Sequence, residues 1–186
     1  MNQRRQQHAP TLARALAAAA LFALAAAALP APAQTRVPRG QLSELKDRRR
    51  VALIVIRTHT VDARDPARAA LDIYRKAFAG APPRLHESGQ RAVSRQLDKY
   101  IRKYGSMAAV GTVAESEFVV IFNVLRARRS FVPDEPYIYG KLFVIARPTV
   151  AGTPPRLVWE SEDNDASVED ALGDFLKALR ALRGER

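Results

Sequence analysis

The chain has 186 residues, a formal net charge of +11 at pH 7 and no cysteine. The lack of cysteine argues against disulfides, thiolate metal sites and a lipid-anchored amino-terminal cysteine. A basic protein of this kind suits anionic lipid, cell-wall polymer or an acidic protein as partner. However, arginine outnumbers lysine 24 to 6 and alanine is abundant. GC-rich coding produces that composition regardless of function, so the charge alone does not identify a partner.

The first 33 residues have the three parts of an export signal. Three arginines and no acid precede a short apolar run over residues 15–29. Small residues follow this run and end at Ala33. The run is shorter than the roughly 20 residues of a membrane span and is mostly alanine. We therefore predict cleavage after Ala33, no remaining membrane span and a periplasmic or secreted protein. An uncleaved anchor helix is the alternative. Cleavage would leave a charge of +8.

A single folded domain is expected over residues 48–186, after a mobile leader at 34–47 that contains few apolar residues. The first strand is expected at 51–56, where VALIVI is apolar without alternation, as in strands buried on both faces. A helix at 66–79 has Asp65 as cap and Pro66 at its first position. A second helix at 89–104 has Ser88 as its candidate cap.

Four strands and a closing helix are predicted in the second half of the chain. A short strand is expected at 107–113, followed by strands at 118–125, 137–146 and 156–161. The 118–125 strand is apolar on both faces and is therefore expected to be central. Gly140 in mid-strand indicates a bulge or a close approach of a neighbouring element. The closing helix begins after Ser167, which has a capping-box spacing to Asp170.

This order, β-α-α-β-β-β-β-α, predicts an α/β fold: a two- or three-layer sandwich with a mixed sheet of about five strands. The same elements resemble an envelope α/β domain in their order and in segments such as VALIVI, ESEFVVIFNVL and RLVWES. That domain occurs in the curli-secretion lipoprotein, in lipoprotein activators of penicillin-binding proteins and in the amino-terminal part of the Tol–Pal translocation protein. The resemblance implies a non-enzymatic periplasmic module that binds a partner protein or assembles with itself. The chain lacks the lipobox cysteine of those lipoproteins, and no functional residue is carried over.

Two groups of side chains are candidates for binding. Arginines occur in clusters at the predicted strand ends, and these clusters would merge into one anion-binding patch if the ends are neighbours. Charged strand ends that only protect a sheet edge are the alternative. The second candidate is the aromatic, Lys-bearing face of the strand at 137–146, which either receives a partner or is covered by the helix at 66–79. The candidate residues are Arg48, Arg49, Arg50, Arg126, Arg128, Arg129, Tyr139, Lys141 and Phe143.

No catalytic residue, metal ligand set or cofactor motif is predicted. His59 follows the first strand, with Asp62 and Asp65 nearby, but the spacing matches no known metal site. Nucleic acid is not an expected partner, since the chain carries an export signal and no nucleic-acid-binding motif. We therefore expect an exported binding or assembly module whose partner is an envelope protein, a second copy or an anionic envelope component. An exported hydrolase that uses His59 with Asp62 or Asp65, and an anionic-polymer or lipid binder that uses the arginines, are the alternatives.

Overall fold

The computed structural model of the chain describes residues 37–57, 65–81, 83–128 and 137–185. The predicted export signal lies outside these residues. The order of the main elements agrees with the order predicted from the sequence, with one short additional strand before the last helix. In chain order the elements are η1 (Leu42–Leu45), β1 (Arg50–Arg57), α2 (Pro66–Phe78), α3 (Glu87–Tyr104), β2 (Ala108–Ala109), η2 (Val113–Glu115), β3 (Phe118–Arg128), β4 (Tyr137–Ala146), β5 (Arg156–Glu160), β6 (Ala166–Ser167) and α4 (Val168–Arg183).

The strands form one mixed sheet in the order β2-β1-β3-β4-β5, and β6 pairs with β4. β1 runs parallel to β2 and β3, whereas β4 is antiparallel to β3 and β5. The prediction of a strand over 107–113 was too long, because β2 has two residues that pair only with Arg50 and Val51. The chain then enters the 3-10 helix η2, whose first turn is capped by the Thr112 hydroxyl.

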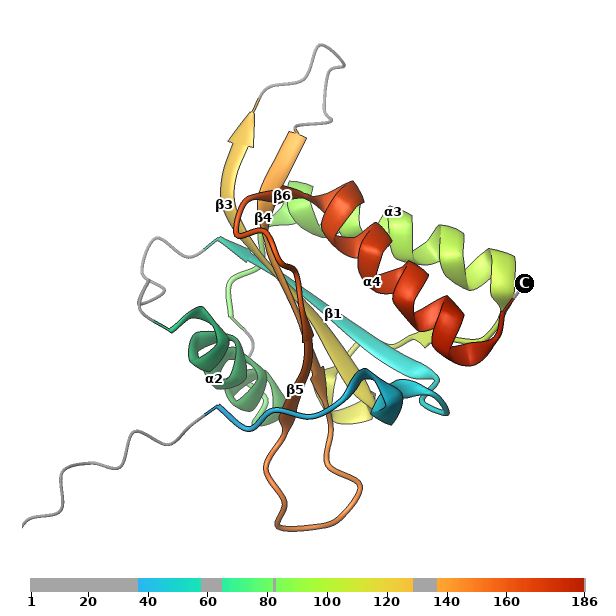
Figure 1. The fold of residues 1–186 in the computed structure, drawn as a ribbon. Helices are drawn as coiled ribbons and strands as arrows, with labels where there is room; N and C mark the ends of the chain where they lie inside the picture. The colour runs from blue at the N-terminus through green and yellow to red at the C-terminus, as the bar shows by residue number, and fades with distance from the viewer. Residues whose placement is uncertain (1–36, 58–64, 82, 129–136, 186) are drawn as a thin grey trace, which may run out of the picture. The chain divides into compact units, whose positions relative to one another are not determined.

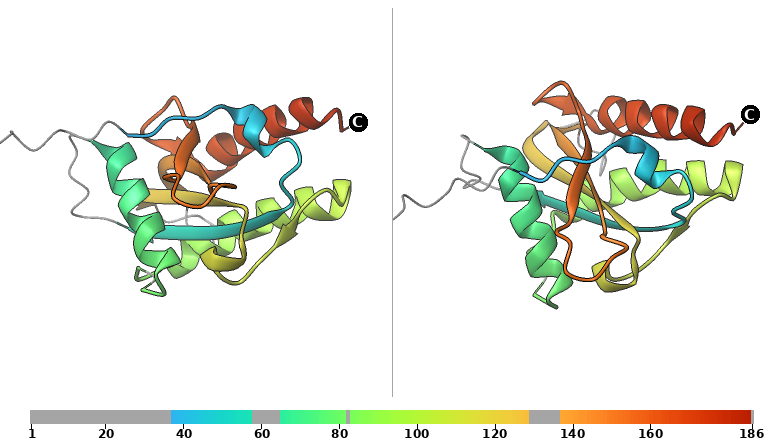
Figure 2. Two further views of the ribbon diagram at one scale, coloured as in Figure 1. Left: turned by 90° about the horizontal axis from the view of Figure 1, so that it is seen from below. Right: turned by 60° about the horizontal axis from the view of Figure 1, so that its bottom comes forward.

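Both faces of the sheet are covered, so the domain has three layers (Figures 1 and 2). Along β3, Phe118, Val120 and Phe122 belong to the core beneath α3 and α4. The alternate residues Val119 and Ile121 belong to the core beneath α2. β1 divides its apolar side chains between the same two cores. This arrangement confirms that the strands predicted at 51–56 and 118–125 are central, since each buries both of its faces.

The helices begin where side chains can accept the free amide hydrogens of their first turns. Asp65 accepts from the Arg68 amide and Ser167 accepts from the Asp170 amide, as the sequence predicted. The predicted cap of the second helix was wrong, because Nδ1 of His86 rather than Ser88 accepts from the Gly89 amide, at 3.0 Å. Helix α3 therefore starts two residues earlier than expected, and Gly89 lies within its first turn, packed tightly against β1 and β3.

The outer edges of the sheet are occupied by groups from neighbouring segments. The Leu157 amide of β5 donates to the Pro38 carbonyl, and the Gly40 amide donates back to the Leu157 carbonyl. On the opposite edge, the Gln90 side chain accepts from the Val55 amide of β1. These contacts satisfy backbone groups that a bare edge would expose for pairing with another chain.

The residues from Val37 onward, which were predicted to be part of a mobile leader, pack against the domain. After its contact with β5 the segment forms η1, and Leu45 is fully buried in the core beneath α3 and α4. The sequence did not predict this packing because two leucines, Leu42 and Leu45, in a short polar stretch give too little periodicity to mark them as buried.

Glu117 joins the starts of β1 and β3. Its carboxylate accepts hydrogen bonds from the Arg49 and Arg50 amides at 2.7 and 2.8 Å. Those bonds, the Arg50 amide first, lower the pKa of the Glu117 carboxyl below its ordinary value. The guanidinium of Arg48 donates to the carbonyl of Glu117, just before β3, and to the carbonyl of Arg147, just after β4. The three strands are therefore tied together at this end.

Arg183, at the end of α4, ties the carboxyl terminus to the amino-terminal segment. Its side chain is only 6% exposed and donates to the Leu45 and Arg48 carbonyls and to the Ser106 hydroxyl. Glu185 follows it and accepts from the Tyr100 hydroxyl of α3. Burial and this carboxylate raise the pKa of Tyr100 to about 12. Several donors on one planar guanidinium let a single side chain satisfy carbonyls from separate segments.

We expect Gly140→Ala to destabilise the protein by about 2–3 kcal/mol or more, because overpacking of a rigid site forces backbone shifts. A Cβ at Gly140 would lie 2.0 Å from the Asn123 carbonyl oxygen on β3. The β3–β4 register also shifts at this point, between Val124 and Arg126. The matched control is Gly173→Ala on the exposed face of α4, where nothing lies within 4 Å of the added atom. That change should stabilise by roughly 0.5–1 kcal/mol. Urea unfolding of both variants measures the difference, and similar free energies would contradict it.

His86 should make stability depend on pH near neutrality. Burial, aided by the Arg57 charge, lowers the pKa of His86, and only an unprotonated Nδ1 can accept from Gly89. Because the pKa of His86 is lower in the folded than in the unfolded state, the cap adds stability that is fully present above about pH 6.5. That stability is lost as the pH falls through the folded-state pKa. His86→Asn, which caps without titrating, should therefore lose less thermal stability than wild type between pH 7.5 and 5.5. Ser88→Ala should follow wild type, and equal pH profiles for His86→Asn and wild type would contradict the assignment.

Candidate functional site

The predicted aromatic face of β4 is divided by helix α2. Phe143 is 1% exposed and packs in the core beneath α2. Tyr139 and Lys141 are half-buried, and Tyr137 is 54% exposed. Because these residues alternate along one strand, they share a face of the sheet. The sequence left open whether this face meets a partner or is covered by a helix. α2 covers it at Phe143, and further toward the start of β4 the side chains are exposed.

Beyond α2 the end of the β3–β4 hairpin presents cations beside tyrosines. Arg126 lies opposite Tyr139 and Arg128 opposite Tyr137 in the strand register. We call the exposed and half-buried side chains on this surface the hairpin face. It consists of Arg126, Arg128, Tyr137, Tyr139 and Lys141. In Figure 1 the described ends of β3 and β4 extend past the neighbouring strands. At about 3.3 Å per residue, the hairpin face runs roughly 13 Å along β4.

The Arg126 guanidinium lies over the Tyr139 ring, 4.4 Å from its centre, and Arg128 lies 5.9 Å from the same ring. A cation over an aromatic face is attracted by the ring quadrupole, and the contact holds both groups in one orientation. Asp165, just before β6, forms an ion pair with Arg126 at 2.6 Å. Two of the cations are therefore stacked on a tyrosine that is fixed to the sheet.

The loop before β6 also positions Lys141, whose ammonium donates to the Asn164 side chain at 2.8 Å. The sequence did not predict this contact. The polar residues before β6 show no local pattern that indicates which strands they will contact. β6 pairs with Tyr139 and Gly140, and this pairing carries Asn164 and Asp165 to the hairpin face.

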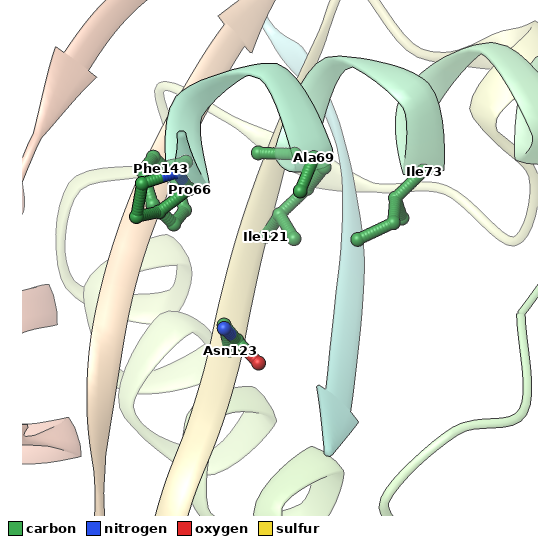
Figure 3. A pocket seen from close by; sticks show the side chains of 7 residues that line it. Pro66, Ala69, Ile73, Ile121, Asn123 and Phe143 are labelled. Carbon is green, nitrogen blue, oxygen red and sulfur yellow. The ribbon is translucent and has the colours of Figure 1, made fainter. Parts of the chain in front are cut away.

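A shallow pocket lies beside the hairpin face, between α2 and the sheet (Figure 3). Figure 3 shows Asn123 on β3, beyond the side chains that α2 contributes. Most of the lining is apolar, and Asn123 is the polar member. The pocket encloses no room for a water molecule, whereas small-molecule sites typically enclose about 300–1,000 Å³. The lining residues are Pro66, Ala69, Ala70, Ile73, Ile121, Asn123 and Phe143.

The two arginine clusters do not form the single patch that was expected if their strand ends were neighbours. Arg50 begins β1 at the end of the sheet where Val51 pairs with Phe118, whereas Arg126 lies eight residues further along β3. At about 3.3 Å per residue the clusters are roughly 26 Å apart. The arginines at 126 and 128 belong to β3 itself, which continues three residues beyond its predicted end. Arg129 lies outside the described residues.

In the cluster at 48–50, Arg48 has a structural role. The half-buried Arg48 donates to three backbone carbonyls, those of Glu44, Glu117 and Arg147. Arg49 and Arg50 have exposed side chains, and Arg50 lies 3.8 Å from the Glu117 carboxylate. This cluster thus fastens strand ends and already faces an acid, which makes it a weaker anion site than the sequence suggested.

The residues considered for acid–base chemistry are only partly described. His59 and Asp62 lie outside the described residues. Asp65 is the cap of α2 and accepts from the Arg68 amide. Within the described parts of the chain, no group of three or more His, Asp or Glu residues is placed to hold a metal ion. The same parts include no helix of the length and apolarity that a membrane span requires.

Comparisons with protein-family models, curated proteins and solved structures found no match. Only the sequence and the structure of this chain therefore bear on its function.

We expect Phe143→Ala and Tyr139→Ala to separate core from surface on the same strand face. Removal of the fully buried Phe143 ring should cost about 3–5 kcal/mol of unfolding free energy. Tyr139→Ala removes a partly exposed ring and its contact with Arg126, so it should cost about 1 kcal/mol or less. Chemical denaturation measures both. A loss for Tyr139→Ala as large as that for Phe143→Ala would mean that the hairpin face belongs to the core.

Proposed function

We propose that the protein is an exported, non-enzymatic binding module that recognises another protein through the hairpin face. The observation that carries the proposal is a surface of two tyrosines and three cations on two paired strands, exposed or half-buried beyond the cover of α2. Tyrosine and arginine are enriched among the residues that contribute most to binding at protein interfaces. The proposal of export depends on the signal-like first 33 residues.

The rigidity of the hairpin face supports binding with a small entropic cost. Tyr139 is held by strand pairing on both sides, to β3 and to β6. Arg126 is held by its ion pair with Asp165 and by the Tyr139 ring. Side chains that are already ordered lose less conformational freedom when a partner binds.

The charge of the hairpin face favours a different protein over a second copy of this chain. A two-fold contact between identical hairpin faces would bring Arg126, Arg128 and Lys141 against the same residues of the other copy. Like charges opposed in this way cost several kcal/mol. We therefore propose a partner that presents carboxylates around an apolar centre, complementary to the cations and to the tyrosine rings.

A photo-crosslinking amino acid placed at Tyr137 of the full chain, in its native envelope, tests this proposal. We expect a covalent adduct with one partner protein, identified by mass spectrometry. The control position is Val150, which is 63% exposed in the turn between β4 and β5 and should give no such adduct. Adding Arg128→Gln and Tyr139→Ala to the crosslinking chain should reduce the adduct at least 10-fold, since hot-spot residues each contribute about 2 kcal/mol or more.

Three results would count against the proposal. Equal adducts at Tyr137 and Val150 would indicate non-specific collision, and an adduct of two copies would indicate self-association. An adduct that persists unchanged in the Arg128→Gln/Tyr139→Ala variant would place the contact elsewhere. In the same preparation, a mature amino terminus other than one near Gln34 would contradict the proposed cleavage after Ala33.

A further inference from the structure

Helix α3 carries a row of cations on the surface that faces away from the sheet. Residues 91, 95, 99 and 103 are spaced by four, which places them on one side of a helix. We call the exposed cations of this helix the basic face of α3. They are Arg91, Arg95, Lys99, Arg102 and Lys103. Glu87 and Asp98 are the only exposed acids of the helix.

The apolar packing of α3 does not involve these cations. α3 packs against the sheet through the opposite side, where Val93, Leu97 and Tyr100 are buried. Like charges four residues apart destabilise a helix by about 0.2–0.5 kcal/mol per pair. The helix dipole favours cations only in the last turn, at Arg102 and Lys103. Arg91 and Arg95 lie in the first half, where the dipole opposes a positive charge.

The cations of α3 are less neutralised than those elsewhere. Arg39, Arg126 and Arg156 each form an ion pair with a carboxylate from a distant segment. Within the part of the chain that the structure describes, Arg91, Lys99 and Arg102 form no ion pair. The helix carries five exposed cations against two exposed acids, Glu87 and Asp98, so the potential over it is positive.

Helix α4 widens the positive surface at the carboxyl end of α3. The two helices lie side by side on the same face of the sheet (Figures 1 and 2). The exposed Arg180 of α4 donates to the Tyr104 hydroxyl at 3.0 Å, and its guanidinium lies 5.8 Å from the centre of that ring. Lys103 lies 5.2 Å from the same ring. Cations from both helices thus meet around Tyr104.

We propose that the basic face of α3 docks the protein on an anionic phospholipid surface. Twelve residues separate Arg91 from Lys103, so the row is about 18 Å long. The exposed side of a straight helix is convex, and it presents spaced charges rather than converging donors around one small anion. The pocket described above lies on the α2 side of the sheet, away from this helix. A spaced row of long, flexible cationic side chains suits a flat surface of many anionic headgroups.

The charge and placement of the basic face imply a reversible, salt-dependent attachment. Each lysine or arginine near an anionic leaflet contributes about five-fold to the binding constant, and salt screens this attraction within a Debye length. The surface lies on α3, whereas the hairpin face lies on β3 and β4. Lipid binding would therefore occur independently of the partner protein, and the inference does not depend on the proposed function.

Vesicle co-sedimentation tests the proposal with residues 34–186, which include the whole compact unit Val37–Arg186. The probes are phosphatidylcholine vesicles with and without 30% phosphatidylglycerol. The test variant is Arg91→Gln/Lys99→Gln/Arg102→Gln. The control variant, Arg68→Gln/Lys76→Gln/Arg84→Gln, removes the same number of exposed charges from α2 and the segment that precedes α3. Both variants should keep the circular dichroism and unfolding midpoint of wild type, because all six positions are exposed.

We expect wild type to bind only the anionic vesicles and to dissociate as salt is raised. The α3 variant should bind on the order of a hundred-fold more weakly, and the control variant should retain most of the binding. An equal loss in the two variants would show that net charge alone attracts the chain, and would overturn the proposal. So would the absence of wild-type binding to anionic vesicles, or co-sedimentation with purified cell-wall polymer but not with vesicles.

Discussion

Burial of β3 on both of its faces is the constraint on which the rest of the structure depends. A strand with apolar side chains on each side must be central in its sheet and must have a layer above and below it. β1 and β4 flank it within the sheet. α2 covers one face, and α3 with α4 covers the other. Each fully buried Phe or Val contributes roughly 1.5–3 kcal/mol relative to exposure, so leaving either face of β3 uncovered would remove several such contributions at once.

The polar contacts that secure this sandwich are concentrated at one end of the sheet. Glu117 accepts from the amides that begin β1, and Arg48 donates to carbonyls at the ends of β3 and β4. Arg183 then joins the carboxyl end of α4 to the same amino-terminal segment. Buried guanidinium groups are costly to desolvate and are stable only when their donors are satisfied. Carbonyls arranged around each of these arginines accept from its terminal NH groups, and these contacts hold both described ends of the chain against the core.

The proposed recognition surface lies at the opposite end of the sheet. There the hairpin extends beyond α2, and its tyrosines and cations are ordered by strand pairing and by the loop before β6. The basic face of α3 is a separate surface with a different chemistry, composed of spaced charges without aromatic anchors. A protein partner and a charged membrane surface require different surfaces, because the first depends on shape and buried contacts and the second on net potential. The proposed roles of the two surfaces can therefore be varied independently.

Sequence patterns alone indicated the fold class, the central strands and the three main helices, because hydrophobic periodicity and capping residues are local signals. The same local patterns placed Tyr139 and Lys141 on a candidate surface. They left open whether Phe143 meets a partner or lies beneath a helix, because the reach of α2 over β4 is a tertiary fact. They also made Arg48 a candidate for binding, and they allowed one merged arginine patch if the strand ends were neighbours. The parallel pairing of β1 and β3 instead places the two arginine clusters at opposite ends of the sheet. The packing of the segment from Val37 and the contacts of Asn164 and Asp165 depend on groups far apart in the chain. The His86 cap is a local contact, but serine is a commoner cap residue than histidine, so the sequence favoured Ser88. Local sequence determines which elements form and which faces are apolar, whereas packing alone determines which polar side chains become structural and which stay exposed.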